Sequence, residues 1–315
     1  MEEQKVDFDQ PRENWEISFG KGRFDFEAVT LPSPMLFTHY APSRIASEAV
    51  LPKTLQIYSI KIAKIKHIKW PLEVYGVVAA RDYVDHKRNI LFYRPRFQTQ
   101  TVTKKDPYLH LTGPSRAIIC LDPVHIEFQL KVKGQSRFED RTLITRPVQI
   151  YNPSRNDWYY RDFSNYLCKI ELCFEQLNWS RQAIILSVRV THGSPFKHGG
   201  QIVCCSSPCE KDPNKEIVLF DSKYGTMNME SDETMCMDSD GYLTLLKNVV
   251  SVQGRLKVFI YTYDCQTSQA TCVLHNRKPS KGKKTSSKVK ITVAWSRLVR
   301  SINDIDQISS FYLNL

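Results

Sequence analysis

The residues best placed to carry out proton transfer are clustered between two apolar stretches, in the segment Arg81–Asn89. His86 follows Asp82 and Asp85, and an imidazole beside a carboxylate can serve as a general acid–base group. The sequence offers no recognisable nucleophile for such a pair. A turn held by carboxylate–guanidinium pairs is the favoured interpretation, with Asp82 and Arg88 as the predicted pair. A hydrolase using the Asp82/His86 region is therefore the least favoured function.

Two further groups have residue types that bind metal ions. Cys205 and Cys209 have the spacing of zinc ligands, with Cys204 beside them. If residues 201–205 form a strand, Cys204 and Cys205 point to opposite faces, so unpaired thiols are favoured over a zinc site, which stays open. The segment that begins at Cys236 resembles a calcium loop, but Cys236 and Lys247 stand where an EF-hand has its first and twelfth ligands. A different calcium site built from loops, with Asp232, Asp238 and Asp240, stays open, and a solvated acidic turn is favoured over it. We expect no metal and no cofactor.

A basic segment near the C-terminus is the one candidate binding loop. It contains seven cationic residues in fourteen: Arg277, Lys278, Lys281, Lys283, Lys284, Lys288 and Lys290. The surrounding residues 242–300 hold twelve Lys and Arg against the single acid Asp264. This excess is typical of a surface for acidic partners, so a nucleic-acid binder is the alternative function. No aromatic residue is interleaved, which argues against base stacking and favours a solvated hairpin loop.

The elements that must position these residues have the pattern of β-strands. The segment 254–263 is rich in β-branched and aromatic residues and is bounded by turn residues. Similar short segments follow one another from residue 54 to residue 298, separated by Gly, Pro and Asn. The chain is 42% hydrophobic and 24% charged, which is ordinary for a globular protein. We therefore predict an all-β fold, a predominantly antiparallel β-sandwich of about a dozen strands.

The domain organisation follows from where this pattern starts and stops. Residues 1–50 are interrupted by prolines and predict a weakly ordered, disordered arm. Residues 51–300 predict a single β-sandwich domain and residues 301–315 a C-terminal tail. The polar stretch 152–162 is the best internal boundary, although a long crossover within one sandwich fits equally well. The predicted core consists of Ile57, Val77, Phe92, Ile118, Phe128, Leu130, Ile170, Leu172, Ile185, Val188, Val203, Leu219, Leu245, Val250, Val258, Ile260, Val293 and Trp295.

The compartment is predicted from what the sequence lacks. Residues 1–7 carry neither a basic region nor an apolar run of the secretory type. The longest apolar runs, such as residues 74–80, are too short to cross a bilayer, so we expect no membrane insertion. Cys120, Cys168 and Cys173 lie inside apolar strand patterns, as reduced thiols do. We expect an intracellular protein, cytoplasmic or nuclear.

The stretch Trp70–Asp82 resembles the opening of a plant family expanded in grasses, catalogued as domain of unknown function 6598. Further matching stretches occur in the same order: Arg88–Phe92, Leu111–Ile118, Asp122–Gly134, Ser187–Val190, Asp240–Leu243, Val249–Val252 and Lys290–Ser296. The resemblance implies an all-β domain without an established activity. It also implies that some relatives are fused to ribosome-inactivating N-glycosidase domains. Where relatives tend to carry a hairpin with Gly and Cys, this chain has the basic segment 277–290.

The fusion partners suggest one enzyme activity, rRNA depurination, which the sequence excludes. That family's signature is a helical Glu-x-x-Arg, and no Glu of this chain has an Arg three residues later. An enzyme is thus not favoured. We expect a non-enzymatic interaction module, most readily for an unknown protein partner in plant stress or defence. The sequence does not identify the ligand, the oligomeric state or the biological process.

Overall fold

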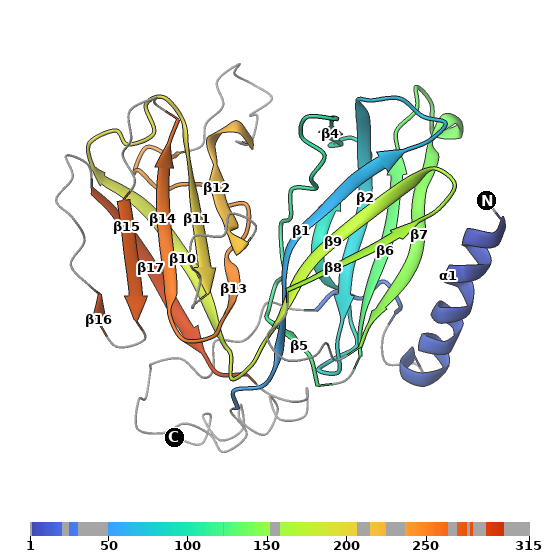
Figure 1. The fold of residues 1–315 in the computed structure, drawn as a ribbon, viewed down its shortest axis with the longest axis horizontal. Helices are drawn as coiled ribbons and strands as arrows, with labels where there is room; N and C mark the ends of the chain where they lie inside the picture. The colour runs from blue at the N-terminus through green and yellow to red at the C-terminus, as the bar shows by residue number, and fades with distance from the viewer. Residues whose placement is uncertain are drawn as a thin grey trace. The chain divides into compact units, whose positions relative to one another are not determined.

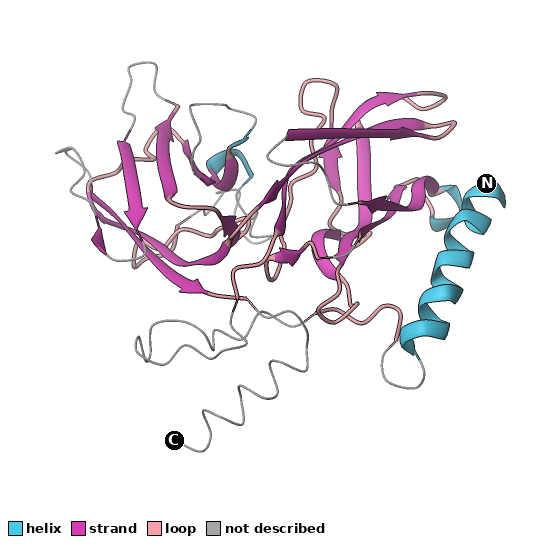
Figure 2. Cartoon of the chain, turned by 60° about the horizontal axis from the view of Figure 1, so that its bottom comes forward, coloured by secondary structure: helices cyan, strands magenta, loops and turns pink. Residues whose placement is uncertain are grey.

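Strands dominate the structure (Figure 2). The computed structural model describes residues 2–20, 25–30, 50–121, 123–151, 158–206, 215–224, 237–263, 270–275, 278–279 and 288–298. Every pairing between named strands in these residues is antiparallel. The prediction of a predominantly antiparallel all-β fold is confirmed.

The chain divides into two compact units. Unit 1 holds the described residues up to Asn178 except 50–51, and unit 2 holds residues 50–51 and those from Trp179 on. The sequence suggested one sandwich over residues 51–300, with 152–162 as its best internal boundary. The division into units falls between Asn178 and Trp179, at a bend in the chain where Trp179 adopts a positive φ of 51°.

Unit 1 is built from two sheets (Figure 1). The first has the order β5-β1-β9-β8, from β1 (Thr54–Ile65), β5 (Ile118–Ile119), β8 (Trp158–Ser164) and β9 (Cys168–Leu177). The second has the order β3-β2-β6-β7, with β4 also paired to β2. Its strands are β2 (Leu72–Arg81), β3 (Asn89–Arg94), β4 (Gln100–Val102), β6 (Val124–Val132) and β7 (Arg141–Ile150). A short 3-10 helix, η2 (Arg137–Glu139), lies in the β6–β7 connection.

The alternation of side chains along these strands decides what is buried. In β6, Ile126, Phe128 and Leu130 enter a core to which both sheets contribute, while the residues between them face the other way. The predicted core residue Val77 lies on the outer face and is only half-buried, because its neighbours at 74, 78 and 80 face the core. Gly76 has φ +123°, and a Cβ there would lie 2.0 Å from the Gln129 carbonyl oxygen. Only glycine therefore lets β2 approach β6 this closely.

Unit 2 also contains two sheets. One has the order β13-β10-β17, from β10 (Arg181–His192), β13 (Val249–Val252) and β17 (Lys288–Ser296). The other has the order β12-β11-β14-β15-β16, from β11 (Gly200–Ser206), β12 (Ile217–Asp221), β14 (Leu256–Thr262), β15 (Ala270–His275) and β16 (Lys278–Pro279), with the 3-10 turn η4 (Ser222–Tyr224). Most of the predicted core of this unit is buried, but Leu245, Ile260 and Val293 are only half-buried.

The N-terminal segment contains a helix where the sequence indicated a weakly ordered arm. Helix α1 spans Glu2–Trp15 and continues into a π-helical turn, η1 (Glu16–Gly20). Phe8 and Trp15, seven residues apart and thus on one helix face, are buried against Phe26 with ring centroids 5.9 and 5.3 Å away. Pro11, inside the helix, concealed this spacing because proline usually ends a helix. Of the helices described, none has the length and apolar character needed to span a bilayer.

We predict that Lys247 lowers the stability of unit 2. Its fully buried side chain has a pKa lowered to about 8 by loss of hydration, so folding at neutral pH places an ammonium group in the interior. Replacing it by methionine should raise the free energy of unfolding at pH 7 by on the order of 3 kcal/mol. Between pH 8 and 10.5 the wild-type unfolded chain binds the extra proton, so wild-type stability rises with pH and the advantage of Lys247→Met shrinks.

Urea-induced unfolding at pH 7 and pH 10 measures both effects, and the exposed Lys290→Met is the matched control. If Lys247→Met stabilises the chain no more than Lys290→Met does at pH 7, the buried ammonium carries no such cost.

Candidate functional site

The outer face of the β2–β6–β7 sheet in unit 1 carries a set of polar side chains. In β6, His125 and Glu127 alternate with the core residues and therefore face outward. The strand register places Arg81 of β2 opposite His125, and Gln149 of β7 on the other side of His125. Helix α1 lies alongside β7 (Figure 1). Of these outward-facing residues, Arg81 and Glu127 are buried, whereas His125 stays exposed.

A pocket of about 580 Å³ lies between the helix and this face. Its walls are largely aromatic or proline side chains, and its polar groups converge from the ends of β2, β6 and β7. The lining residues are Phe8, Pro11, Asn14, Trp15, Ser18, Phe26, Arg81, Asp82, Tyr83, His86, Pro123, His125, Glu127, Pro147 and Gln149. Every one of them belongs to unit 1.

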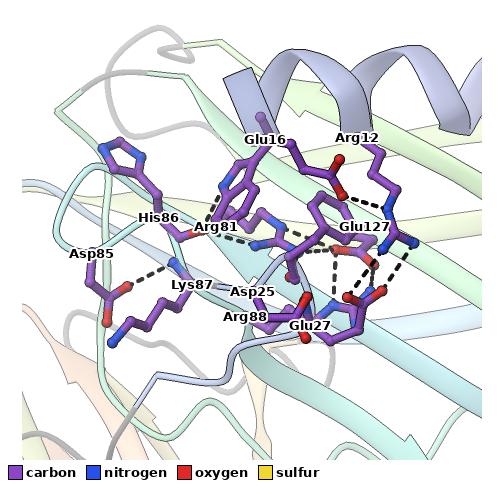
Figure 3. A network of polar contacts seen from close by, with 12 residues as sticks. Arg12, Glu16, Asp25, Glu27, Arg81, Asp85, His86, Lys87, Arg88 and Glu127 are labelled. Carbon is purple, nitrogen blue, oxygen red and sulfur yellow. Dashed lines mark hydrogen bonds and ion pairs between the residues drawn. The ribbon is translucent and has the colours of Figure 1, made fainter. Parts of the chain in front are cut away.

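Glu127 forms the charged floor of the pocket and is almost completely buried. Arg81 donates to its Oε2 from Nε at 3.1 Å and from Nη2 at 2.9 Å, and Arg88 donates to both of its oxygens. Figure 3 shows the two guanidinium groups converging on this carboxylate, with the His86 ring turned away from it. Two buried cations around one buried anion satisfy the carboxylate, which a single partner would not.

Arg81 also joins the floor to the helix. Its guanidinium carbon lies 4.1 Å from the centroid of Phe26 and 5.0 Å from that of Trp15, within the range of cation–π attraction. Its remaining donors reach the carbonyl oxygens of His86 at 2.9 Å and Phe26 at 2.6 Å. The Trp15 indole donates to the same His86 oxygen at 3.0 Å. Helix α1, the 82–88 loop and strand β6 are therefore connected through one side chain.

A second cluster fixes the 82–88 loop and corrects the predicted Asp82–Arg88 pair. Asp82 is paired with Arg116, whose Nη1 and Nη2 each lie 2.6 Å from a carboxylate oxygen, whereas Arg88 is bound to Glu127. Arg116 Nη2 also donates to Asp85 at 3.0 Å, and Thr30 donates to the other oxygen of Asp85. Burial alone would raise the pKa of Asp85, but Arg116 and these hydrogen bonds outweigh it and hold that pKa below its ordinary value.

The Asp82 carboxylate has no capacity left to act as a base. Oδ1 accepts from Arg116 and from the Val84 amide at 3.1 Å, and Oδ2 accepts from Arg116 and from the Ile119 amide at 2.8 Å. Each oxygen thus has two donors, which fills its lone pairs. The structure brings Asp82, Asp85 and His86 into one region, yet both carboxylates are bound to Arg116.

The two imidazoles of the pocket are neutral hydrogen-bonding groups at neutral pH. Burial lowers the pKa of His86, against the opposing charges of Asp82 and Asp85. Burial also lowers the pKa of His125, and the nearby charge of Arg81 adds to this effect. The His125 ring nitrogen Nε2 lies 3.4 Å from the Gln149 amide nitrogen. Histidine and glutamine thus give the pocket polar groups that carry no charge.

The other candidate sites fall partly or wholly outside the described residues. Of the basic segment, Arg277, Lys281, Lys283 and Lys284 lie outside them, the backbone of Lys278 is in β16, and Lys288 and Lys290 begin β17, so nucleic-acid binding there stays a prediction. Cys204 and Cys205 are buried in β11 and are not joined in a disulfide, and Cys209 lies outside the described residues. Burial raises the pKa of the Cys204 thiol.

The acidic turn is described only in part, since Asp232 lies outside the described residues. Asp238 accepts from the Asp240 and Tyr242 amides at 3.0 and 2.8 Å, as in a capped turn. Within the ranges that the structure describes, no group of three or more His, Cys, Asp or Glu side chains could hold a metal ion. Whether Cys204, Cys205 and Cys209 bind zinc stays open.

Sequence reasoning missed most of the pocket. It found Asp82 and His86 but assigned no role to Glu127, His125 or the helix that covers them. Two signals were available: Phe8 and Trp15 repeat at a helical spacing, and Glu127 is the one acid among the polar, outward-facing residues of β6. Neither signal reveals on its own that the helix packs over that strand.

Comparisons with known proteins give one family and one distant structure. The family described as "Domain of unknown function (DUF6598)" matches residues 54–294. No curated protein matches the sequence. A calcium-bound solved structure of the two C2 domains of Extended-Synaptotagmin 2 is similar at 10% identity and a TM-score of 0.24, covering 80% of this chain and 97% of that one. A TM-score this low does not establish a common fold.

We predict that Glu127→Gln destabilises unit 1 by about 3–5 kcal/mol, because it leaves the buried Arg81 and Arg88 without their counter-charge. The control is Asp162→Asn, which removes an ion pair to Lys169. The side chain of Asp162 is 59% exposed and that of Lys169 is 33% exposed. That change should cost less than about 1 kcal/mol. Urea-induced unfolding at pH 7 compares the two, and equal losses would show that Glu127 is not a structural centre of this unit.

Proposed function

Since the chain belongs to the DUF6598 family, whose function is unknown, we propose a function from the pocket itself: a non-enzymatic binding module that takes an apolar, ring-containing group beneath α1. The observation that carries the proposal is the pocket between α1 and the β2–β6–β7 sheet. Its volume of about 580 Å³ lies in the range of small-molecule sites.

The chemistry of the walls supports an apolar guest. Phe8, Trp15, Phe26, Pro123 and Pro147 offer rings against which a flat apolar group can pack. The charged groups below them are already satisfied, since the donors of Arg81 are taken by Glu127 and by two carbonyl oxygens. A ligand therefore meets little uncompensated charge. Asn14, Gln149 and the two neutral imidazoles line the pocket with polar groups that can orient it.

The same geometry supports binding in preference to catalysis. A general base needs a free lone pair within reach of the proton that it removes. Both oxygens of Asp82 and both oxygens of Glu127 accept hydrogen bonds from arginine side chains. In this proposal these carboxylates hold the 82–88 loop and the floor in place.

The occupant comes from one of two sources that share this chemistry. A free small molecule would fill the pocket entirely, and a protein partner, which the sequence favoured, would insert a single apolar side chain. The resemblance implies relatives fused to N-glycosidase domains, so we place the recognition event in plant stress or defence. An intracellular setting belongs to the same proposal.

We predict saturable binding of N-phenyl-1-naphthylamine, a neutral apolar probe, with a dissociation constant on the order of 10 µM and one site per chain. Asn14 lines the pocket from an exposed position on α1, so Asn14→Trp should fill the space without removing a core contact. This variant should weaken binding at least about tenfold. The readout is the fluorescence of the probe during titration of the full chain.

Glu13→Trp is the matched control, because Glu13 is the exposed neighbour of Asn14 on the same helix and does not line the pocket. It should bind the probe as the wild type does. Absence of saturable binding in the wild type, or equal affinities for Asn14→Trp and Glu13→Trp, would contradict the proposal.

A further inference from the structure

Four connections of unit 1 converge at the end of the second sheet that lies away from the pocket. Val74, near the start of β2, pairs with Gln100 at the start of β4 and with Val132 at the end of β6. The β1–β2, β3–β4 and β6–β7 connections, and residues 103–107 after β4, therefore leave the sheet close together, and Figure 1 shows the first and third at the same end of the unit. The pocket residues Arg81, at the end of β2, and His125, near the start of β6, lie at the other end of the sheet from these connections.

Two of these connections are fixed to one another by Asp140. Arg96, in the β3–β4 connection, donates to its two oxygens at 2.8 and 3.1 Å and to the Gly134 carbonyl oxygen at 3.2 Å. The Tyr75 hydroxyl and the Gly134 amide donate to the same carboxylate at 2.7 and 2.8 Å. The Arg96 hydrogen bonds are the largest cause of a pKa of Asp140 well below its ordinary value. The loops that carry residues 97 and 138 are thus held side by side.

Each of these connections exposes a phenylalanine. Phe138 is 101% exposed and Phe97 is 78% exposed, so neither ring is covered by this chain. Single apolar residues on a surface are ordinary. Here Phe97 directly follows Arg96, and Phe138 precedes Asp140 by two residues. Both apolar rings are thus next to the side chains that fix the loops together. An apolar pair held in this way indicates contact with something outside the unit.

The same end of the sheet is strongly cationic. Residues 64–70, 94–99, 103–107 and 131–141 hold eleven Lys and Arg against three acids, of which Asp140 is already bound to Arg96. Exposed members of the set are Lys64, Lys66, Lys69, Lys104, Lys105, Lys131, Lys133, Arg137 and Arg141. The connections that carry the two phenylalanines therefore have an excess of positive charge.

We propose that this surface, the aromatic tip formed by Phe97, Phe138 and the surrounding cations, docks on the surface of an anionic lipid bilayer. The rings enter the boundary between headgroups and acyl chains, and the lysines and arginines contact the phosphate and carboxylate groups of the lipids. Two rings that project from adjoining loop ends suit a flat, deformable surface. A nucleic-acid strand instead needs a groove that tracks its backbone, with rings along it.

The sequence-based expectation of no membrane insertion concerned segments that cross the bilayer. Docking at its surface requires no such segment. The proposal is also separate from the pocket, since its residues lie at the other end of the same sheet. Failure of one does not affect the other.

The test uses the full chain and sedimentation with vesicles of phosphatidylcholine alone or with about 30% phosphatidylserine. We expect binding to the mixed vesicles and at least about tenfold weaker binding to the neutral ones. The double variant Phe97→Ala and Phe138→Ala should weaken binding to mixed vesicles by about tenfold or more, as the loss of two buried rings predicts. The double variant Lys133→Glu and Arg137→Glu should remove the preference for phosphatidylserine. About 0.5 M NaCl should weaken the binding of the wild type to mixed vesicles.

Matched controls come from the opposite end of the unit. Ile17→Ala removes an apolar side chain that is 67% exposed, and Lys53→Glu reverses an exposed charge before the start of β1. Both should bind mixed vesicles as the wild type does. All of these positions are exposed, so the variants should keep the wild-type unfolding midpoint.

Several results would overturn the proposal. One is absence of binding to mixed vesicles, and another is equal binding to neutral ones. A third is wild-type binding by the phenylalanine double variant. A fourth is a single-stranded oligonucleotide that binds through Phe97 and Phe138 while mixed vesicles do not, which would make the tip a nucleic-acid surface. A fifth is loss of vesicle binding in millimolar inorganic phosphate at constant ionic strength, which would show recognition of a free anion.

Discussion

The arrangement of unit 1 depends on one buried carboxylate, Glu127, and the two guanidinium groups that neutralise it. Glu127 stands on the outer face of a sheet, where water would ordinarily solvate it. Helix α1, Phe26 and the 82–88 loop cover it instead, which is tolerable only because Arg81 and Arg88 accompany it. Arg81 then stacks on Trp15 and Phe26, so the charge balance and the docking of the helix share one side chain. The pocket is the space that this packing leaves open.

In unit 1 the core and the connections at the two ends of the sheets differ in their chemistry. The core between the sheets is apolar and gives rigidity, while the connections at each end carry the chemistry. At one end, Arg116 and two aspartates fix the 82–88 loop beside the pocket. At the other end, Asp140 with Arg96 fixes the loops of the aromatic tip. Both ends therefore use charged pairs to hold a loop.

The strands were predictable from sequence because alternation and β-branched residues act locally. The predicted run of strands from residue 54 begins with β1 (Thr54–Ile65), and Phe128, Leu130, Ile170 and Leu172 are core residues as predicted. Val77 was wrongly assigned to the core. Residues 76 and 78 lie on the core side of β2, so Val77 between them faces outward, and a run of consecutive apolar residues does not show which side each one takes. Helix α1 was missed because Pro11 argues against a helix locally, whereas the burial of Phe8 and Trp15 against Phe26 is a tertiary effect. The Asp82–Arg116 pair joins residues 34 apart in sequence, which no local pattern reveals.

Hydrogen–deuterium exchange of the native full chain at pH 7 tests most directly whether α1 is docked over Glu127. Docking predicts slow exchange of the α1 amides from residue 8 to residue 15, together with slow exchange in β6 and the 82–88 loop. It also predicts that Glu127→Gln accelerates exchange in α1 and the loop while β10 and β13 of unit 2 stay protected. Exchange of α1 at the rate of an unfolded peptide in the wild type, or unchanged protection of α1 in Glu127→Gln, would contradict the account.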